Sequence, residues 1–444
     1  MWKYYVVAHW IIQTTTTTAH NNGFGPGRQD WGFSEVRQGA HMFWWLYFVT
    51  DSDVDHYSER PIVIWLQGGP GGSSTGYGNF EEIGPLDLDL HERPHTWVKY
   101  FNVLFIDNPV GAGYSHVDDA TYLSKNNEEI AQDLVNLMRQ FYETFPEFRK
   151  TPLHIFSESY GGKMAVQFAY QLHLAVKDGS IVSNLRSVAL GAPWISPEDS
   201  VMSWGEFLLN LGFVDTKGFG VIHKAAKSIR VSMRDNQTKA ATDLWRSMQH
   251  IVTKEAIGID CYNVLKPQRS ISAAISKDEY EMLHFGEQHP IQHDMMHTMD
   301  SSHKLNRLMR GPVSTTLGIP NHVLWGSQKD MVFAALFDDF MKPTTQVVET
   351  LLNTTELDVI IYTGQLDLVV STPGTVRWVE KLQWPGREGY LNAPRQGIDY
   401  RGVLEGYEKN YGKLTMYWID RAGHMAPVDN HMAIQYILDK HVIV

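Results

Sequence analysis

The chain of 444 residues has a single cysteine, Cys261. One thiol cannot form a disulfide within the chain, and it excludes zinc and iron–sulfur sites built from several cysteines. Basic residues are also in the minority, because 38 Lys and Arg stand against 50 Asp and Glu, a formal net charge of −12. Nucleic acids and anionic membrane surfaces are bound through basic faces, so neither partner is expected. No run of 18 apolar residues occurs, so no membrane span is expected either.

The composition that remains is typical of a folded globular protein. Hydrophobic residues make up 43% of the chain, charged residues 20% and aromatic residues 12%. This is enough apolar material for a sizeable core, and it excludes global disorder. Asn236 and Asn353 begin N-glycosylation triplets, but about two such triplets occur by chance in a chain of this length. The oligomeric state is left open.

The N-terminus has the outline of a signal peptide. Lys3 precedes an apolar stretch at residues 4–12, and a threonine run then leads to the small residue Ala19. A positive start, an apolar centre and a small residue before a cut are the features of such a segment. His9 weakens the apolar centre, so a loose leader is the alternative. A signal peptide predicts a secreted or lysosomal protein.

Short apolar runs bounded by turn residues alternate with helical patterns. Buried strands are expected at residues 62–66, 103–106, 153–156, 188–190, 359–362 and 414–419. Helical periodicity is clearest at residues 127–145 and 162–176. This alternation predicts an α/β fold with a mostly parallel sheet flanked by helices.

The alternation is interrupted in the middle of the chain, which predicts four segments. They are a leader with a loose N-terminus at 1–30, a first part of the core at 31–195, a helical, lid-like insertion at 196–320 and a second part of the core at 321–444. The chemically rich loops follow the core strands, at residues 67–75, 107–115, 157–162, 364–367 and 421–429. Ligands bind at the carboxyl ends of the strands in open α/β sheets, so these loops predict one composite site.

A candidate nucleophile, Ser159, lies between an expected strand and an expected helix. A nucleophile elbow needs small residues two positions before and after its serine, because the turn is tight. Gly161 meets this requirement, whereas Ser157 replaces the usual glycine. An ordinary Ser- and Gly-rich turn is the alternative.

A serine hydroxyl needs a histidine to take its proton and a carboxylate to hold that histidine. Asp367 follows an expected strand, and His424 lies in a loop after the last one. The chain order Ser, Asp, His is that of α/β-hydrolases. Taken singly, Asp367 could instead cap a helix and His424 could be an ordinary loop histidine.

Four blocks of sequence resemble the serine carboxypeptidases, α/β-hydrolases that remove C-terminal residues from peptides. The blocks are WLQGGPGGSS at 65–74, DNPVGAGYS at 107–115, SESYG at 157–161 and GHMAP at 423–427. The resemblance extends from about residue 31 to the end of the chain. Together with residues 79–85 and 194–197, the blocks look closest to the retinoid-inducible branch of that family.

The resemblance implies a role for each matching position. Ser159 would be the nucleophile, His424 the base and Asp367 its orienting carboxylate. The backbone N–H groups of Gly69 and Tyr160 would form the oxyanion hole. The family needs no cofactor, and its substrates are the C-termini of peptides or proteins.

The resemblance also implies a site for the terminal carboxylate of the substrate, formed by Gln67, Gly68, Glu82 and Glu158. Two glutamates can bind an anion if they share a proton, and closely spaced carboxyl groups raise each other's pKa. An acidic pH optimum is therefore expected.

The chain departs from the family pattern at three positions. Gln67 stands where most relatives have Asn, Ser157 where they have Gly, and Gly72 where many have Cys. Substrate preference and rate are the properties that these changes put in question, and the insertion must be held by packing without disulfides. An esterase or acyltransferase on the same scaffold, and a weakly active secreted binding protein, are the alternative functions.

No metal site is expected from the spacing of possible ligands. The HERPH pattern at 91–95 matches a zinc-protease motif, but Pro94 is incompatible with the helix which that motif requires. The insertion contains a loose group of histidines at 284, 289, 293, 297 and 303, which surface exposure explains without a metal.

Overall fold

The structure is a computed structural model that describes residues 23–50, 54–266 and 299–443. The expected signal peptide and four of the five histidines of the insertion lie outside the described residues. Among the helices of the described part, none combines the length and the apolar character needed to cross a membrane.

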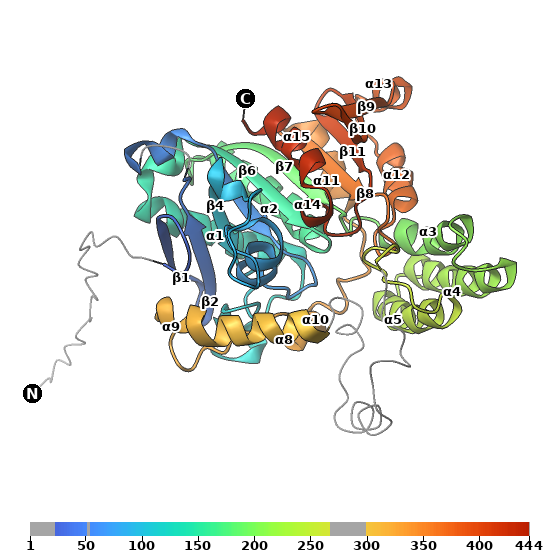
Figure 1. The fold of residues 1–444 in the computed structure, drawn as a ribbon, viewed down its shortest axis with the longest axis horizontal. Helices are drawn as coiled ribbons and strands as arrows, with labels where there is room; N and C mark the ends of the chain where they lie inside the picture. Colours follow the sequence, from blue (N-terminus) through green and yellow to red (C-terminus); the bar gives the residue numbers. More distant parts are fainter. Residues whose placement is uncertain (1–22, 51–53, 267–298, 444) are drawn as a thin grey trace, which may run out of the picture.

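A mixed sheet of eleven strands forms the centre of the described structure (Figure 1). Its middle is parallel and consists of β4 (Asn102–Ile106), β3 (Ile62–Leu66), β6 (Pro152–Glu158), β7 (Asn184–Gly191), β8 (Asp358–Gly364) and β11 (Leu414–Ile419), in that order. Antiparallel strands extend both ends, namely β2 (Ala40–Tyr47), β1 (Gln29–Arg37) and β5 (His116–Val117) on one side, and β10 (Val403–Tyr411) and β9 (Gln396–Tyr400) on the other.

The sheet is buried on both faces because successive side chains of a strand point in opposite directions. In β3, Ile62, Ile64 and Leu66 pack into one core cluster, whereas Val63 and Trp65 pack into another. The first cluster is covered by α1 (Asn127–Thr144), α2 (Gly161–Lys177), α11 (Thr345–Thr354) and α12 (Thr372–Lys381). The second is covered by η2 (Ser74–Ile83), α8 (Met299–Leu308) and α15 (His431–His441).

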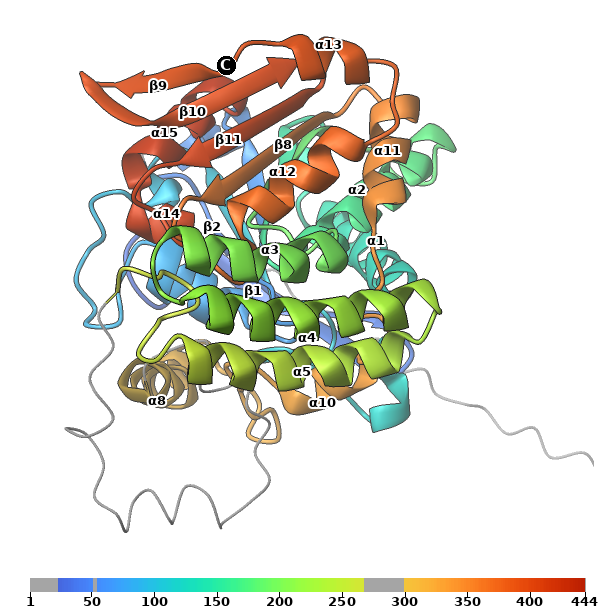
Figure 2. The ribbon, with the colours of Figure 1, turned by 90° about the vertical axis from the view of Figure 1, so that its right-hand side faces the viewer.

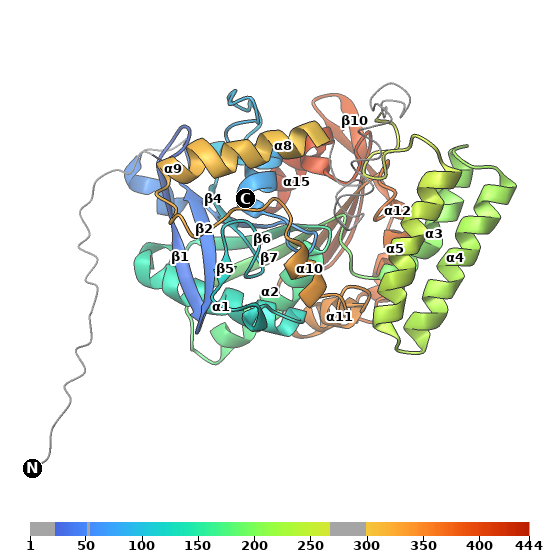
Figure 3. The ribbon, with the colours of Figure 1, turned by 90° about the horizontal axis from the view of Figure 1, so that it is seen from below.

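Three long helices stand beside the sheet, stacked side by side (Figures 2 and 3). They are α3 (Pro197–Asn210), α4 (Thr216–Arg234) and α5 (Thr238–Glu255). In α4 the Asp215 side chain accepts from the N–H of Gly218 at the N-terminus, and Ile222, Ala226 and Ile229 form the buried stripe. Within the described residues of 196–320 the regular elements are helical, as expected. The boundaries of the four segments stay a prediction.

Shorter elements connect these layers. They are η1 (Val54–Glu59), η3 (Trp97–Lys99), η4 (Ala120–Tyr122), η5 (Pro146–Arg149), η7 (Met309–Val313), α9 (Ser314–Thr316), α10 (Asp330–Ala335), α13 (Arg387–Asn392) and α14 (Ala426–Asp429). The expected fold class, an α/β-hydrolase fold with a mostly parallel sheet, is confirmed.

Candidate active site

Ser159 sits in a sharp turn between β6 and α2. Its φ of +59° is left-handed, a conformation that costs a residue with a side chain on the order of 1–3 kcal/mol. Backbone hydrogen bonds fix the turn, because the Ser159 N–H donates to Gly191 O and the Ser159 carbonyl accepts from Gly162 N–H and Trp194 N–H, each at 2.9 Å. Ser157 fits in place of glycine because its buried hydroxyl donates to Ala189 O at 3.3 Å.

Asp367 and His424 form a buried pair. His424 Nδ1 lies 2.7 Å from Asp367 Oδ2, and the other carboxylate oxygen accepts from the N–H of Val370 at 3.0 Å. The two loops cross at a glycine, because a Cβ added to Gly364 would lie 2.0 Å from the carbonyl oxygen of Gly423. Only a residue without a side chain allows this approach, so Gly364 sets the spacing of the pair.

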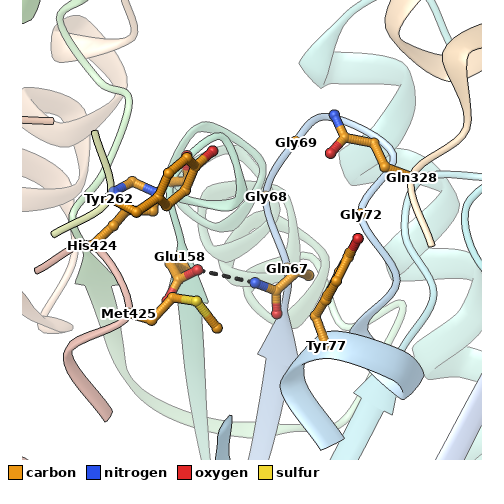
Figure 4. A pocket seen from close by; sticks show the side chains of 11 residues that line it. Gln67, Gly68, Gly69, Gly72, Tyr77, Glu158, Tyr262, Gln328, His424 and Met425 are labelled. Carbon is orange, nitrogen blue, oxygen red and sulfur yellow. Dashed lines mark hydrogen bonds between the residues drawn. The ribbon is translucent and has the colours of Figure 1, made fainter. Parts of the chain in front are cut away.

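The second ring nitrogen of His424 faces the same pocket as Ser159. Among the described residues His424 Nε2 has no hydrogen-bond partner, although it is buried. Because Nδ1 is engaged with Asp367, Nε2 is the nitrogen available to take a proton from a group in the pocket. Tyr262 covers the imidazole, since its ring stands edge-on to His424 at 4.8 Å and its carbonyl accepts from the His424 N–H (Figure 4).

The glycine-rich loop after β3 lies directly against the serine turn. A Cβ added to Gly68 would be 2.6 Å from Ser159 Cβ and 3.0 Å from Tyr160 N. Gly69 has φ +114°, which only glycine adopts readily. Within the described ranges, the backbone N–H groups of Gly69 and Tyr160 donate to no backbone acceptor. These two amides are therefore free to bind an oxyanion.

Gln67 joins two buried carboxyl groups beside this turn. Its Nε2 donates to Glu82 Oε1 and to Glu158 Oε1, each at 3.0 Å (Figure 4 shows the bond to Glu158). Its Oε1 accepts from the Trp65 indole N–H at 2.8 Å, which fixes which end of the amide faces the glutamates. The structure thus brings Gln67, Glu82 and Glu158 together, as the resemblance implied.

The two carboxyl groups hold protons more tightly than ordinary ones. Burial, and next the charge of Glu82, raise the pKa of Glu158 well above its usual value. Burial also raises the pKa of Glu82, against hydrogen bonds with Glu158 and Gln67 that lower it. Among the described residues, the Oε2 atoms of both glutamates are buried without a partner. A proton held by the pair therefore has oxygens on which it can sit and donate to a ligand.

The buried Asp107 carboxylate holds the glycine-rich loop in place through hydrogen bonds. Its carboxylate accepts from the Ser73 hydroxyl at 2.8 Å, from the N–H and hydroxyl of Thr75 at 3.0 and 2.8 Å, and from the N–H of Tyr114 at 2.9 Å. Burial raises the pKa of Asp107, against these hydrogen bonds. The sequence placed residue 107 in a loop near the site but gave it no role.

The pocket also has walls that the sequence did not predict. Tyr77, Tyr262, Gln328 and Met425 line it together with the predicted residues (Figure 4). Met425 follows His424 directly, so the motif itself could have pointed to it. Tyr262 and Gln328 come from segments without a recognisable pattern, and only the tertiary structure places them here.

The chain matches one family of known proteins along nearly its whole length. Residues 21–442 match the serine carboxypeptidase family. The chain belongs to the serine carboxypeptidase family. It is 40% identical to the retinoid-inducible serine carboxypeptidases of rat (Rattus norvegicus) and of Homo sapiens over 91% of this chain and 89% of each relative. It is 38% identical, with the same coverage, to serine carboxypeptidase-like 51 of Arabidopsis thaliana.

A solved structure shares the fold. Kex1(delta)p, described as a prohormone-processing carboxypeptidase from Saccharomyces cerevisiae, superposes with a TM-score of 0.78 at 20% identity, over 94% of this chain and 91% of that one. The expected family and branch, and the reaction class of a serine-type carboxypeptidase, are confirmed by these findings. Peptides are the substrate class of this family.

Proposed function

We propose that this carboxypeptidase removes C-terminal residues through an acyl-enzyme on Ser159. The observation that carries the proposal is a single pocket lined by Ser159, His424 and the Gln67–Glu158 pair, with Asp367 bonded to the histidine behind it. A nucleophile with its base and a group that binds the substrate terminus are both needed for cleavage of the last peptide bond. Both are within one pocket here.

In the first step His424 Nε2 takes the proton of the Ser159 hydroxyl while the oxygen attacks the carbonyl carbon of the last peptide bond. The carbonyl oxygen becomes an oxyanion and accepts from the N–H groups of Gly69 and Tyr160. Collapse of this intermediate breaks the C–N bond, and His424 gives its proton to the leaving amine. Asp367 stabilises the imidazolium and keeps Nδ1 protonated.

In the second step water hydrolyses the acyl-enzyme. His424, again neutral, takes a proton from the water as the oxygen attacks the acyl carbon. The second tetrahedral intermediate uses the same two N–H groups. Its collapse releases the shortened peptide as an acid and returns the proton to Ser159.

The terminal carboxylate of the peptide binds at the glutamate pair. Both N–H bonds of the Gln67 amide are already directed at Glu82 and Glu158. Among the four residues assigned to this site, the donors left for the substrate are the O–H of a protonated glutamate and the N–H of Gly68, which has no backbone acceptor within the described part of the chain. Gln67 therefore acts as a positioning residue that holds the two carboxyl groups together.

Mass spectrometry of one short peptide tests this function. The free acid and the C-terminal amide are each incubated near pH 5 with the wild type and with Ser159→Ala. Stepwise loss of C-terminal residues from the free acid only, by the wild type only, is expected. Equal cleavage of the amide would favour an esterase or acyltransferase that does not require a free C-terminal carboxylate. No trimming of any peptide in a panel would favour a binding protein.

We further propose that the chain enters the secretory route, to be secreted or lysosomal. The supporting observations are the charge and apolar pattern of residues 3–19 and the similarity to the retinoid-inducible branch. Expression of the full chain in a eukaryotic host, followed by N-terminal sequencing, tests this proposal. A product that stays in the cytosol with Met1 intact would contradict it.

A further inference from the structure

A group of histidines and one aspartate lies away from the pocket, at the junction of β2 and β5. His41 and His116 are directly opposite in the antiparallel pairing of these strands, so both side chains stand on one face (Figure 3 shows the two strands beside each other). Asp118 follows two residues after His116, and its backbone N–H donates to the carbonyl of Gly39 at 2.9 Å. The strand pairing thus holds all three residues together.

The donor atoms of these three side chains converge. One ligand atom from each of His41, His116 and Asp118 can be chosen so that all lie within 4.8 Å of one another. His41 Nε2 is already 3.2 Å from Asp118 Oδ1. Four ligands at about 2.0–2.2 Å around a tetrahedral zinc lie roughly 3.3 Å apart. Bringing ligand atoms that lie up to 4.8 Å apart to this spacing takes a movement of about 1.5 Å, shared between exposed and partly exposed side chains.

The imidazole of His116 is oriented for a ligand. Its Nδ1 lies 3.4 Å from the carbonyl oxygen of Tyr114, which favours the tautomer with the proton on Nδ1 and the lone pair on Nε2. A backbone carbonyl behind the ring is the usual support of a metal-bound histidine. The rings of His41 and His116 are stacked at 4.7 Å, and Phe33 stands edge-on to His116 at 5.4 Å.

A third imidazole is adjacent. The ring of His322 stands edge-on to that of His116, with their centroids 5.6 Å apart. His322 is exposed, so either this ring, after a change of rotamer, or a water can occupy a fourth position. The donor set is two or three imidazoles and one carboxylate. Such a set suits zinc, whereas calcium and magnesium need oxygen ligands throughout.

We propose that His41, His116 and Asp118 form a binding site for a divalent transition metal ion, with zinc as the preferred ion. His41 lies 75 residues before His116 in the sequence, so no local spacing motif reveals the complete set of three ligands. A bound ion would link β2 to β5, the strand that follows the loop carrying Asp107 and Tyr114. The inference does not depend on the proposed function, because the site contains none of the pocket residues.

Zinc binding to the untagged full chain tests this proposal. Stoichiometry and affinity are measured at pH 7.5 by competition with a chromophoric chelator, for the wild type and for His41→Gln/His116→Gln. The matched control is His91→Gln, which removes an exposed histidine that also faces an aspartate, with Nδ1 3.5 Å from Asp87 Oδ2. Because this pair lacks a second imidazole, the control is expected to bind zinc as the wild type does.

The wild type is expected to bind one more zinc ion than the double variant. The single variant His116→Gln should bind that ion at least 10-fold more weakly. Zinc in 100-fold excess over Kd should raise the Tm of the wild type by about 2–4 °C and leave that of the double variant unchanged. Without zinc, equal Tm values for the wild type and the three variants would show that the variants fold. Equal stoichiometry and affinity in the wild type and the double variant, or no binding by either, would overturn the proposal.

Discussion

Gln67 shows how much can depend on one side chain. The sequence has a glutamine where the family resemblance implies an asparagine in most members, and the extra methylene puts the geometry of the carboxylate site in question. In the structure this longer amide spans from the Trp65 indole to both glutamates. The substitution is therefore accommodated because Trp65 fixes the amide oxygen. Its effect on substrate preference stays a prediction.

At the same scale we predict that Glu158→Gln makes binding of a peptide less dependent on pH. The raised pKa of Glu158 means that the pair holds its proton at acid pH and loses it as the pH rises through that pKa. The resulting anions repel the substrate carboxylate, so the KM of the wild type for a free-acid peptide should rise by up to tenfold per pH unit there. In the variant, the amide that replaces the Glu158 carboxyl group can donate a hydrogen bond at every pH. The rise of KM with pH should therefore be smaller than in the wild type.

The measurement is kcat and KM between pH 4.5 and 8 for a free-acid peptide and for an ester substrate without a carboxylate. Glu92→Gln, at an exposed carboxyl group, is the control and should follow the wild type. The ester should show no rise in KM in any of the proteins. A variant whose KM for the free acid rises as steeply as that of the wild type would contradict the proton-sharing pair.

At the scale of elements, the interior of the sheet was predictable, whereas the edge formed by β9 and β10 was not. The strands expected at 62–66 and 414–419 match β3 and β11 to the residue. Both are apolar on both faces, because they lie inside the sheet. β9 and β10 were not predicted, since they form an edge with several exposed residues and lack a continuous apolar run. The helical segment η2 was not predicted, because glycines within it disfavour a helix.

A buried charge lies in the first turn of α2. Lys163 Nζ donates to Asp339 Oδ2 at 3.0 Å and to Asp339 O at 2.6 Å, and both side chains are at least nine-tenths buried. The same carboxylate accepts from the hydroxyl of Tyr160 at 2.8 Å. Burial lowers the pKa of Lys163, and the charge of Asp339 opposes this shift. The network thus ties the residue after the nucleophile to the segment that precedes α11.

We predict that Lys163→Met destabilises the protein by about 3–5 kcal/mol, because it leaves the Asp339 carboxylate buried without its cation. Urea unfolding followed by fluorescence measures this change. Lys177→Met, at the exposed end of the same helix, is the control and should change stability by less than about 0.5 kcal/mol. Adding Asp339→Asn to Lys163→Met should cost less than the sum of the two single changes. Additive costs would show that the pair is not coupled.

At the scale of the whole molecule, the site depends on how the helices of the middle segment pack. Residues after α5 return to the sheet, where Leu368 N–H and Val369 N–H donate to the carbonyl of Cys261, and Tyr262 covers His424. Burial raises the pKa of the Cys261 thiol to about 12, so this cysteine serves as an apolar core residue and not as a reactive group. With one cysteine, these contacts hold the segment without disulfides.

We predict that Trp245→Ala destabilises the molecule by about 3–5 kcal/mol. Trp245 on α5 is 4% exposed and packs against Phe340 at 4.5 Å and Trp194 at 6.1 Å, so it joins the middle segment to the core. Thermal and urea unfolding measure the change. Leu211→Ala, at a residue that is 48% exposed, is the control and should have little effect. If Trp245→Ala behaved like this control, the ring contacts would not join the two parts.

The sequence by itself determined the family, the fold class and the interior strands, because apolar periodicity and the motifs after the strands are local properties. Its motifs also indicated Ser159, Asp367 and His424 as candidate catalytic residues, in the chain order of α/β-hydrolases. Only the tertiary structure decided which side chains meet: Tyr262 with His424, and the two histidines of β2 and β5. These contacts join residues far apart in the chain or on opposite strands. Strand register and helix packing determine these contacts, and no short stretch of sequence determines either of them.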